Sequence, residues 1–325
     1  ASTDIHDIRS FTFSSIQALK WDNGNGNSRW NNSTNWAPNT IPTTGTDVVL
    51  DNTYVGSNQA IDLRATQTIR SLQIDAPFSY TLNNNTLAFN NNGIPGIGGI
   101  HVTDLNGTAN HTINSAITAV NPISINNDSA GGLTINGNIT TISNTVSVGG
   151  TGNTTINGNL ILGASGLTKT DSGTVTISGT GNSYTGATTI QLGTLKLGAS
   201  GVIPNTSTVV IGSGGTLNVN GKTETIGGLS GTGILAMNGG VINLGGTNTF
   251  GGSITGTGTI NLLAGFNYTL GAPINNSLLT MNSAGGTINL NGFNSTIGTL
   301  NITGNTILDF GNSSATTLSL TNLNI

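Results

Sequence analysis

The feature that most constrains the fold is a five-residue phrase, Gly-Thr-aliphatic-polar-aliphatic, that recurs along the second half of the chain. Alternation within it places its two aliphatic side chains on one face of a short strand and its polar side chains on the other. Copies occupy 173–177, 193–197, 215–219, 258–262, 286–290 and 298–302, with a close variant at 240–244. Most are separated by roughly 20 to 28 residues, the period of a solenoid with one repeat per coil. The last two are closer together, which predicts two strands of a single coil.

One such coil cannot bury its apolar face alone, whereas stacked coils can, because every strand pairs with the strands above and below it. The sequence therefore predicts an all-β fold, a right-handed parallel β-helix over 51–325 with its best repeat at 173–220. A dozen or so coils spaced by about 4.8 Å would form a rod on the order of 60 Å long. Outward Thr and Ser suit an exposed sheet face, and stacked Asn can form amide ladders. We expect Ile190, Leu195 and Leu197 to point inward.

Charge and cysteine content exclude several kinds of function. Charged residues make up 6% of the chain, and its 8 basic residues are outnumbered by 12 acidic ones. A phosphate-binding surface needs a basic face, so we expect no nucleic-acid partner. The chain has no Cys, which excludes disulfides, thiol catalysis and thiolate metal sites. No stretch approaches the roughly 18 apolar residues of a membrane span, so we expect no membrane insertion by this chain.

The N-terminal part has a different composition, because all 3 Trp lie near its start. Terminal repeats of solenoids are commonly atypical and cover the exposed end coil. We interpret 21–50 as such a cap, ending in the strand Asp47–Leu50. The alternative is an aromatic patch that binds sugar. The residues concerned are Trp21, Trp30 and Trp36.

Both extremities of the chain are candidates for self-assembly. Residues 1–20 are expected to form an arm or strand that reaches a neighbouring subunit, with the side chains Phe11, Phe13 and Ile16. The sequence begins Ala-Ser-Thr, as a mature chain does after cleavage at a small-residue site. The other extremity stops inside an alternating pattern, and an uncovered strand edge is a template for pairing. Either the natural chain continues there, or another copy covers the side chains of Leu318, Leu320, Leu323 and Ile325.

A catalytic or metal site finds little support. A polysaccharide lyase on a β-helix needs clustered carboxylates and a nearby Arg or Lys, but the charges after 173 are only Lys196, Lys222, Glu224 and Asp309. Lys222 and Glu224 are two residues apart, so we expect them to share a face as a surface ion pair. His101, Asp104 and His111 lack a fourth ligand or a zinc-type spacing, and we expect surface loop histidines. The sequence thus predicts no enzyme, no metal and no cofactor.

The segment 178–198, SGTGNSYTGATTIQLGTLKLG, closely resembles the autotransporter-associated β-strand repeat of bacterial secreted and surface proteins. A degenerate copy occupies 245–265, and the Trp-rich 21–50 and the segment 291–314 also resemble parts of such proteins. The resemblance implies a secreted parallel β-helix at the bacterial cell surface, structural or adhesive, without catalytic residues.

These observations favour an extracellular structural protein, a β-solenoid subunit that self-assembles into a surface fibre, filament or sheath through its ends. The alternative is an adhesin passenger that binds glycan or a host surface, and a minor alternative is a polysaccharide-acting enzyme. An ice-binding face is disfavoured, because the outward positions mix Thr with Asn, Lys and Ser instead of forming a regular Thr array.

Overall fold

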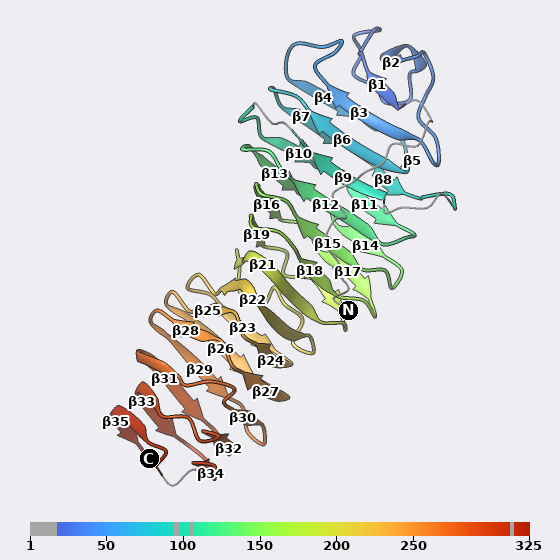
Figure 1. The fold of residues 1–325 in the computed structure, drawn as a ribbon. Coiled ribbons are helices and arrows are strands. Elements are labelled where there is room, and N and C mark those ends of the chain that lie inside the picture. Colours follow the sequence, from blue (N-terminus) through green and yellow to red (C-terminus); the bar gives the residue numbers. More distant parts are fainter. Residues whose placement is uncertain (1–17, 94–97, 104–106, 313–314) are drawn as a thin grey trace, which may run out of the picture.

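The computed structural model, which describes residues 18–93, 98–103, 107–312 and 315–325, is a parallel β-solenoid (Figure 1). The chain makes about 13 turns, close to the predicted dozen. Most turns contribute strands to three columns, and within a column a strand pairs with its equivalents in the neighbouring turns. Within the described residues the pairings are parallel except that of β1 with β2 in the first turn.

The first column runs the whole length of the rod. Its strands are β1 (Leu19–Trp21), β3 (Asp47–Asp51), β6 (Ser71–Asp75), β9 (Gly98–Val102), β12 (Ile123–Asn127), β15 (Val146–Gly149), β18 (Leu167–Lys169), the first parts of β21 (Thr188–Leu197) and β22 (Thr208–Asn218), β24 (Gly228–Gly231), β27 (Thr247–Phe250), β30 (Asn267–Thr269), β32 (Gly286–Asn289) and β34 (Thr306–Asp309).

The second column lies beside it in the same sheet. It contains β4 (Gln59–Asp62), β7 (Tyr80–Asn83), β10 (His111–Ile113), β13 (Gly132–Ile135), β16 (Asn153–Ile156), β19 (Thr174–Ile177), the last parts of β21 and β22, β25 (Ile234–Ala236) and β28 (Ser253–Thr255).

The third column consists of two six-stranded sheets. The first holds β5 (Gln67–Ile69), β8 (Thr86–Phe89), β11 (Ala116–Ala119), β14 (Ile139–Thr141), β17 (Leu160–Gly163) and β20 (Ser183–Tyr184). The second holds β23 (Thr223–Ile226), β26 (Gly240–Leu244), β29 (Gly258–Leu262), β31 (Asn275–Ser283), β33 (Ser295–Ile302) and β35 (Leu318–Asn324). The last two copies of the phrase lie in consecutive strands, β32 and β33, of different sheets, as the single-coil prediction requires.

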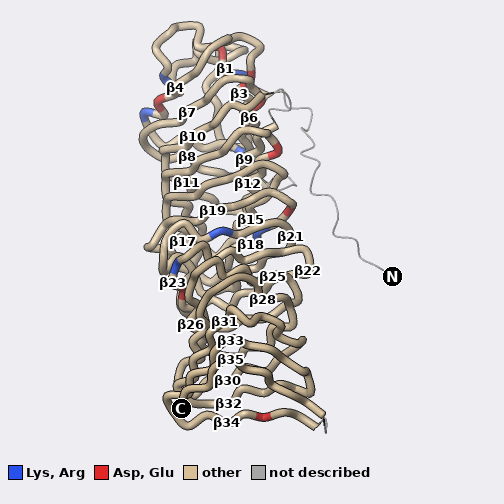
Figure 2. Tube along the Cα trace, turned by 90° about the vertical axis from the view of Figure 1, so that its left-hand side faces the viewer, with Lys and Arg blue, Asp and Glu red and all other residues tan. Residues whose placement is uncertain are grey.

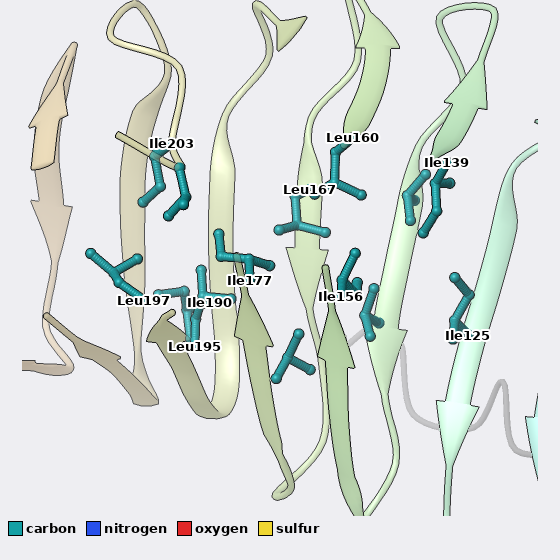
Figure 3. Packing of buried hydrophobic residues seen from close by; sticks show 14 of the residues in the cluster. Ile125, Ile139, Ile156, Leu160, Leu167, Ile177, Ile190, Leu195, Leu197 and Ile203 are labelled. Carbon is teal, nitrogen blue, oxygen red and sulfur yellow. The ribbon is translucent and has the colours of Figure 1, made fainter. Parts of the chain in front are cut away.

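Buried hydrophobic side chains, most of them aliphatic, fill the interior from Leu19 to Leu300. Figure 3 shows some of them in the middle of the rod. Ile190, Leu195 and Leu197 are fully buried, so their predicted inward orientation is confirmed. Each side chain stacks on those of neighbouring turns, and burying a Leu or Ile is worth about 1.5–3 kcal/mol. The packed interior therefore supports the strands of all three columns from the inside.

Asparagine ladders run up the outside of the rod. In the N-terminal half Asn114 Nδ2 donates to Asn83 Oδ1 at 2.7 Å, and the chain continues through Asn136 and Asn157. In the C-terminal half Asn261 Nδ2 donates to Asn243 Oδ1 at 2.7 Å, with the same bond repeated by Asn282, Asn301 and Asn324. The predicted amide ladders therefore exist and join successive turns.

Charged side chains gather in the N-terminal turns and become sparse toward the other end (Figure 2). After Glu224 the sequence contains a single charged residue, Asp309. In the described part of the chain no helix is long and apolar enough to cross a membrane.

Candidate functional surfaces

The three tryptophans meet at the N-terminal end of the rod. Trp21 lies in β1 and Trp36 in β2 (Trp36–Ala37), which follows the 3-10 helix η1 (Ser33–Asn35). The Trp36 ring packs edge-on against Trp21 and Trp30, with ring centroids 5.0 and 4.7 Å apart. Its Nε1 also donates to the Trp30 carbonyl oxygen at 2.8 Å.

All three rings are 0% exposed, so none offers a face on which a sugar could stack. The alternative of a Trp-based sugar patch is therefore wrong, and the burial fits the cap interpretation. The cap also covers the first strand of the second column, because Trp30 N donates to Asp62 O at 2.9 Å and Asp62 N donates to Ser28 O at 2.9 Å. The N-terminal end of the solenoid is closed.

Ion pairs join the first strands of the rod to one another. Lys20 Nζ lies 2.6 Å from Asp51 Oδ2. Burial raises the pKa of Asp51, but hydrogen bonds from Lys20 and Thr53 outweigh it and hold that pKa below its ordinary value. Arg70 and Asp47 form a buried pair, and the hydrogen bond to Asp47 raises the pKa of Arg70. Paired and buried in this way, the carboxylates serve the structure and are poorly placed for acid–base chemistry.

The expectation of surface loop histidines is wrong for His111. This residue opens β10 and is fully buried, with its Nδ1 accepting the Tyr80 backbone N–H at 3.2 Å. Burial lowers its pKa to about 4, so it is neutral. His101 lies in β9, where its Nε2 is 3.0 Å from Asp128 Oδ2. Asp104 lies outside the described residues, and no group of three potential metal ligands occurs among those described.

The predicted surface ion pair of Lys222 and Glu224 is also wrong. Glu224 has the same parity as the buried Ile226, so it points into the rod and is 0% exposed. Its Oε2 accepts the Val202 backbone N–H at 2.8 Å. In the turn that lies between β20 and β23 along the third column, residues 202–203 form a loop and the column has no strand. The Glu224 carboxylate there accepts the backbone hydrogen bond that a neighbouring strand would otherwise accept. Burial raises the pKa of Glu224 to about 7.

Lys169 is a second ionisable group inside the rod. It ends β18 at an inward position and is 1% exposed. Its Nζ donates to the carbonyl oxygens of Thr170, of Asp171 at 2.7 Å and of Leu192 at 3.1 Å. Burial lowers the pKa of this amine to about 8. The ammonium group lies at the corner where the chain passes from the first column to the second, and it binds carbonyl oxygens of two successive turns.

Our sequence reasoning missed Lys169 and Glu224 as interior residues, although a signal for both is present. In Leu-Thr-Lys and in Glu-Thr-Ile, each charged residue is two positions from an apolar residue of the same strand, so both side chains point to the same face. Strict alternation therefore places both charges on the inner face.

The C-terminal turn presents strand edges that lack a pairing partner among the described residues. Strand β35 pairs with β33 on one side, and β34 pairs with β32. Leu318 and Leu320 are half-buried, whereas Leu323 is 50% and Ile325 is 92% exposed. The other predicted assembly residues, Phe11, Phe13 and Ile16, lie outside the described residues.

A family model described as Passenger-associated-transport-repeat matches residues 167–197. The match begins at β18 and ends with β21, so it covers Lys169 and the buried Leu195 and Leu197. It overlaps most of the segment from which the resemblance was drawn. No curated protein and no solved structure matches the chain. The repeat and the β-solenoid together fit an autotransporter passenger-type repeat protein.

Proposed function

We propose that this passenger-type chain is a structural protein of the bacterial cell surface, a stiff rod that acts through its outer surfaces. The observation that carries the proposal is the unbroken stack of turns, filled with aliphatic side chains and joined outside by asparagine ladders. A solenoid gains stability turn by turn from its neighbours, which suits a part that must extend from a surface. The ionisable groups inside the rod are used for structure.

Secretion to the cell surface is part of this proposal. The passenger-associated repeat at 167–197 supports it, as does a rod whose solubility depends on neutral polar side chains. Surface exposure is testable by adding protease to intact cells that produce the full-length protein. Digestion of the solenoid before lysis is the expected result, and protection until lysis contradicts the proposal.

We further propose that rods associate through the C-terminal turn. The exposed side chains of Leu323 and Ile325 support this contact, as do the edges of β34 and β35 that have no pairing partner among the described residues. Asp309 is the one charged residue after Glu224, so two such ends do not repel each other strongly. Because the cap closes the opposite end, this contact alone forms a two-fold dimer. Growth into a filament needs a second contact, for which the N-terminal arm with Phe11, Phe13 and Ile16 stays the prediction.

Electron microscopy and analytical ultracentrifugation of the purified chain over a concentration series test the association. We expect dimers that lengthen into filaments, and Leu323→Lys should reduce both. Val120→Lys is a matched control, since Val120 is similarly exposed (54%) but lies far from the C-terminal turn. Monomers at every concentration, or equal loss in both variants, contradict association through this turn.

A further inference from the structure

Two outer rows of the second column form a regular polar lattice. One row consists of threonines in five successive turns, from β7, β10, β13, β16 and β19 (Figure 1). The Cα pairing of these strands aligns them directly, without a register shift: Thr81, Thr112, Thr134, Thr155 and Thr176. Two residues further along the chain is the second row, whose first member ends β7 and whose other members directly follow the ends of their strands: Asn83, Asn114, Asn136, Asn157 and Ser178. We call these ten residues the Thr/Asn array.

The sequence hides this order. Successive rungs are separated by unequal lengths of chain, 31 residues between Asn83 and Asn114 but 21 between Asn136 and Asn157. In the five turns from β7 to β19 the fold sorts the mixture that argued against an ice-binding face into a row of Thr and a row of Asn that ends in Ser178. That argument therefore does not hold for these five turns.

The array is rigid for two reasons. The residue between each Thr and Asn points inward and is buried, as Ile135 and Ile156 are, so the backbone rests on the core. The asparagine side chains are held in place by one another, with Asn136 Nδ2 2.7 Å from Asn114 Oδ1 and Asn157 Nδ2 2.8 Å from Asn136 Oδ1. Side-chain ladders of this kind are a recognised means of keeping a sheet flat.

The chemistry of the array is uniform. Each Thr presents a methyl group and a hydroxyl, and its χ1 angle is restricted by β-branching. Asn114 and Asn136, inside the ladder, each use one amide hydrogen and one carbonyl lone pair for their neighbours, which leaves one of each for a ligand. Within the ladder Asn83 only accepts and Asn157 only donates. The array is bounded in register by charges, Asp62 beside Asn83 and Lys196 beside Thr176, and contains none itself.

The ligand must therefore match a flat, uncharged lattice of hydroxyl and amide groups. Rungs repeat at about 4.8 Å along the rod, and each Thr lies about 7 Å from the second-row residue two positions after it. Five rungs therefore span about 19 Å, and the array covers on the order of 130 Å² between Cα positions, far below the roughly 800 Å² that a stable protein partner needs. A flat face without aromatic rings is also unlike the concave pockets that bind small ligands. The surface of an ice crystal is a repeating lattice of water molecules, and each of them both donates and accepts hydrogen bonds, as the Thr hydroxyls and Asn amides do.

We propose that the Thr/Asn array binds ice. Water molecules held between the threonine methyl groups and bonded to the hydroxyls and amides would continue the lattice of an ice surface. A second, shorter array supports the same chemistry: in the C-terminal half Thr259, Thr280 and Thr299 are aligned in β29, β31 and β33, beside the ladder of Asn261, Asn282 and Asn301. The proposal goes beyond the structural role and does not depend on association of rods.

The test uses purified protein in assays of thermal hysteresis and of ice recrystallisation. The array variant carries Thr134→Lys and Thr155→Lys in the first array with Thr259→Lys and Thr280→Lys in the second, four large charged side chains in the middle of the rows. The control variant carries Thr118→Lys and Thr140→Lys, an aligned, half-buried outward pair on the third column. Circular dichroism confirms that each variant is folded. Thr155→Ser, which keeps the hydroxyl and removes the methyl group, is a milder second test.

We expect the wild type to shape ice crystals and slow their recrystallisation, and the control variant to behave in the same way. The array variant should lose most of this activity, and Thr155→Ser should lose part of it. A wild type that behaves like serum albumin at equal concentration overturns the proposal. Equal loss in control and array variants overturns it as well. So does a protein that leaves ice unaffected but shows array-dependent dimerisation in the ultracentrifuge or array-dependent binding to crystalline cellulose, since the partner is then a second copy or a solid glycan.

Discussion

Truncation of Trp36 to Ala should unfold the cap without unfolding the rod. The ring is fully buried between Trp21 and Trp30, and truncation of a buried Trp costs about 3–5 kcal/mol. Loss of the Nε1 donor also leaves the Trp30 carbonyl oxygen without that hydrogen bond, which costs about 1 kcal/mol more. In a solenoid each turn is stabilised mainly by its neighbours, so the loss stays near the end where it occurs.

Two spectroscopic probes separate the cap from the rod. The 3 tryptophans all lie in the cap, whereas the 4 tyrosines lie outside it. Tryptophan fluorescence, excited selectively, therefore reports on the cap, and far-ultraviolet circular dichroism reports on all turns. In urea, Trp36→Ala should lower the midpoint of the fluorescence transition strongly and leave most of the circular dichroism transition in place. Trp36→Phe keeps an aromatic ring and loses the hydrogen bond, so it should cost about 1–2 kcal/mol.

An unchanged fluorescence midpoint in Trp36→Ala refutes the packing argument. If both signals are lost together at low urea, the three tryptophans hold the whole rod and are more than a terminal cap.

Three further predictions concern single positions in the turns. The pKa of Glu224 is raised from 4.5 to about 7, so the folded state holds this proton more tightly than the unfolded state, and the Glu224 contribution to stability should fall by roughly 3 kcal/mol as pH rises from 4.5 to 7. Buried His111, whose pKa is lowered from 6.5 to about 4, should add about 3 kcal/mol over nearly the same pH range, so the two contributions oppose each other. Glu224→Gln should therefore make stability rise more steeply between pH 4.5 and 7 in urea titrations than it does in the wild type, and an unchanged pH dependence contradicts the assignment. Asn261→Ala breaks the hydrogen bonds to Asn243 and Asn282, so it should lower the free energy of unfolding by about 1–2 kcal/mol. Thr259→Ala in the neighbouring row should change it by no more than about 0.5 kcal/mol. Equal losses in the two variants would show that the ladder adds no stability. Gly99→Ala should lower the free energy of unfolding by about 3 kcal/mol or more, because the φ of Gly99 is +155° and an added Cβ would lie 1.9 Å from the Ser124 carbonyl oxygen. The thermal midpoint should fall far more in this variant than in Gly26→Ala, where the added Cβ meets nothing within 4 Å.

The sequence was sufficient to predict what depends on local alternation. Leu195 and Leu197 share a parity within one short strand, and that parity is enough to place both inside. The recurrence of the phrase then identified stacked turns, because such strands have no other way to bury one apolar face.

What could not be predicted depends on which turns stack and in what register. Glu224 meets Val202, 22 residues earlier, and Lys169 meets Leu192, 23 residues later, through contacts between turns that no local pattern describes. The Thr/Asn array is hidden for the same reason, since insertions of different length separate its rungs. The register between paired strands decides which side chains are neighbours. Loops of unequal length separate those strands in the sequence, so the register cannot be recognised there.

Alignment of the threonine row is the central structural claim, and engineered cysteines test it directly because the chain contains no native Cys. Thr134 and Thr155 are register partners, so their Cα atoms should lie about 4.8 Å apart, within the roughly 4.4–6.8 Å range of disulfides. Thr134→Cys with Thr155→Cys should form an intramolecular disulfide on mild oxidation, measured by mass spectrometry of proteolytic peptides. Thr134→Cys with Thr176→Cys, two turns apart, should remain reduced. A disulfide in the second pair but not in the first would contradict the register on which the ladders and the array depend.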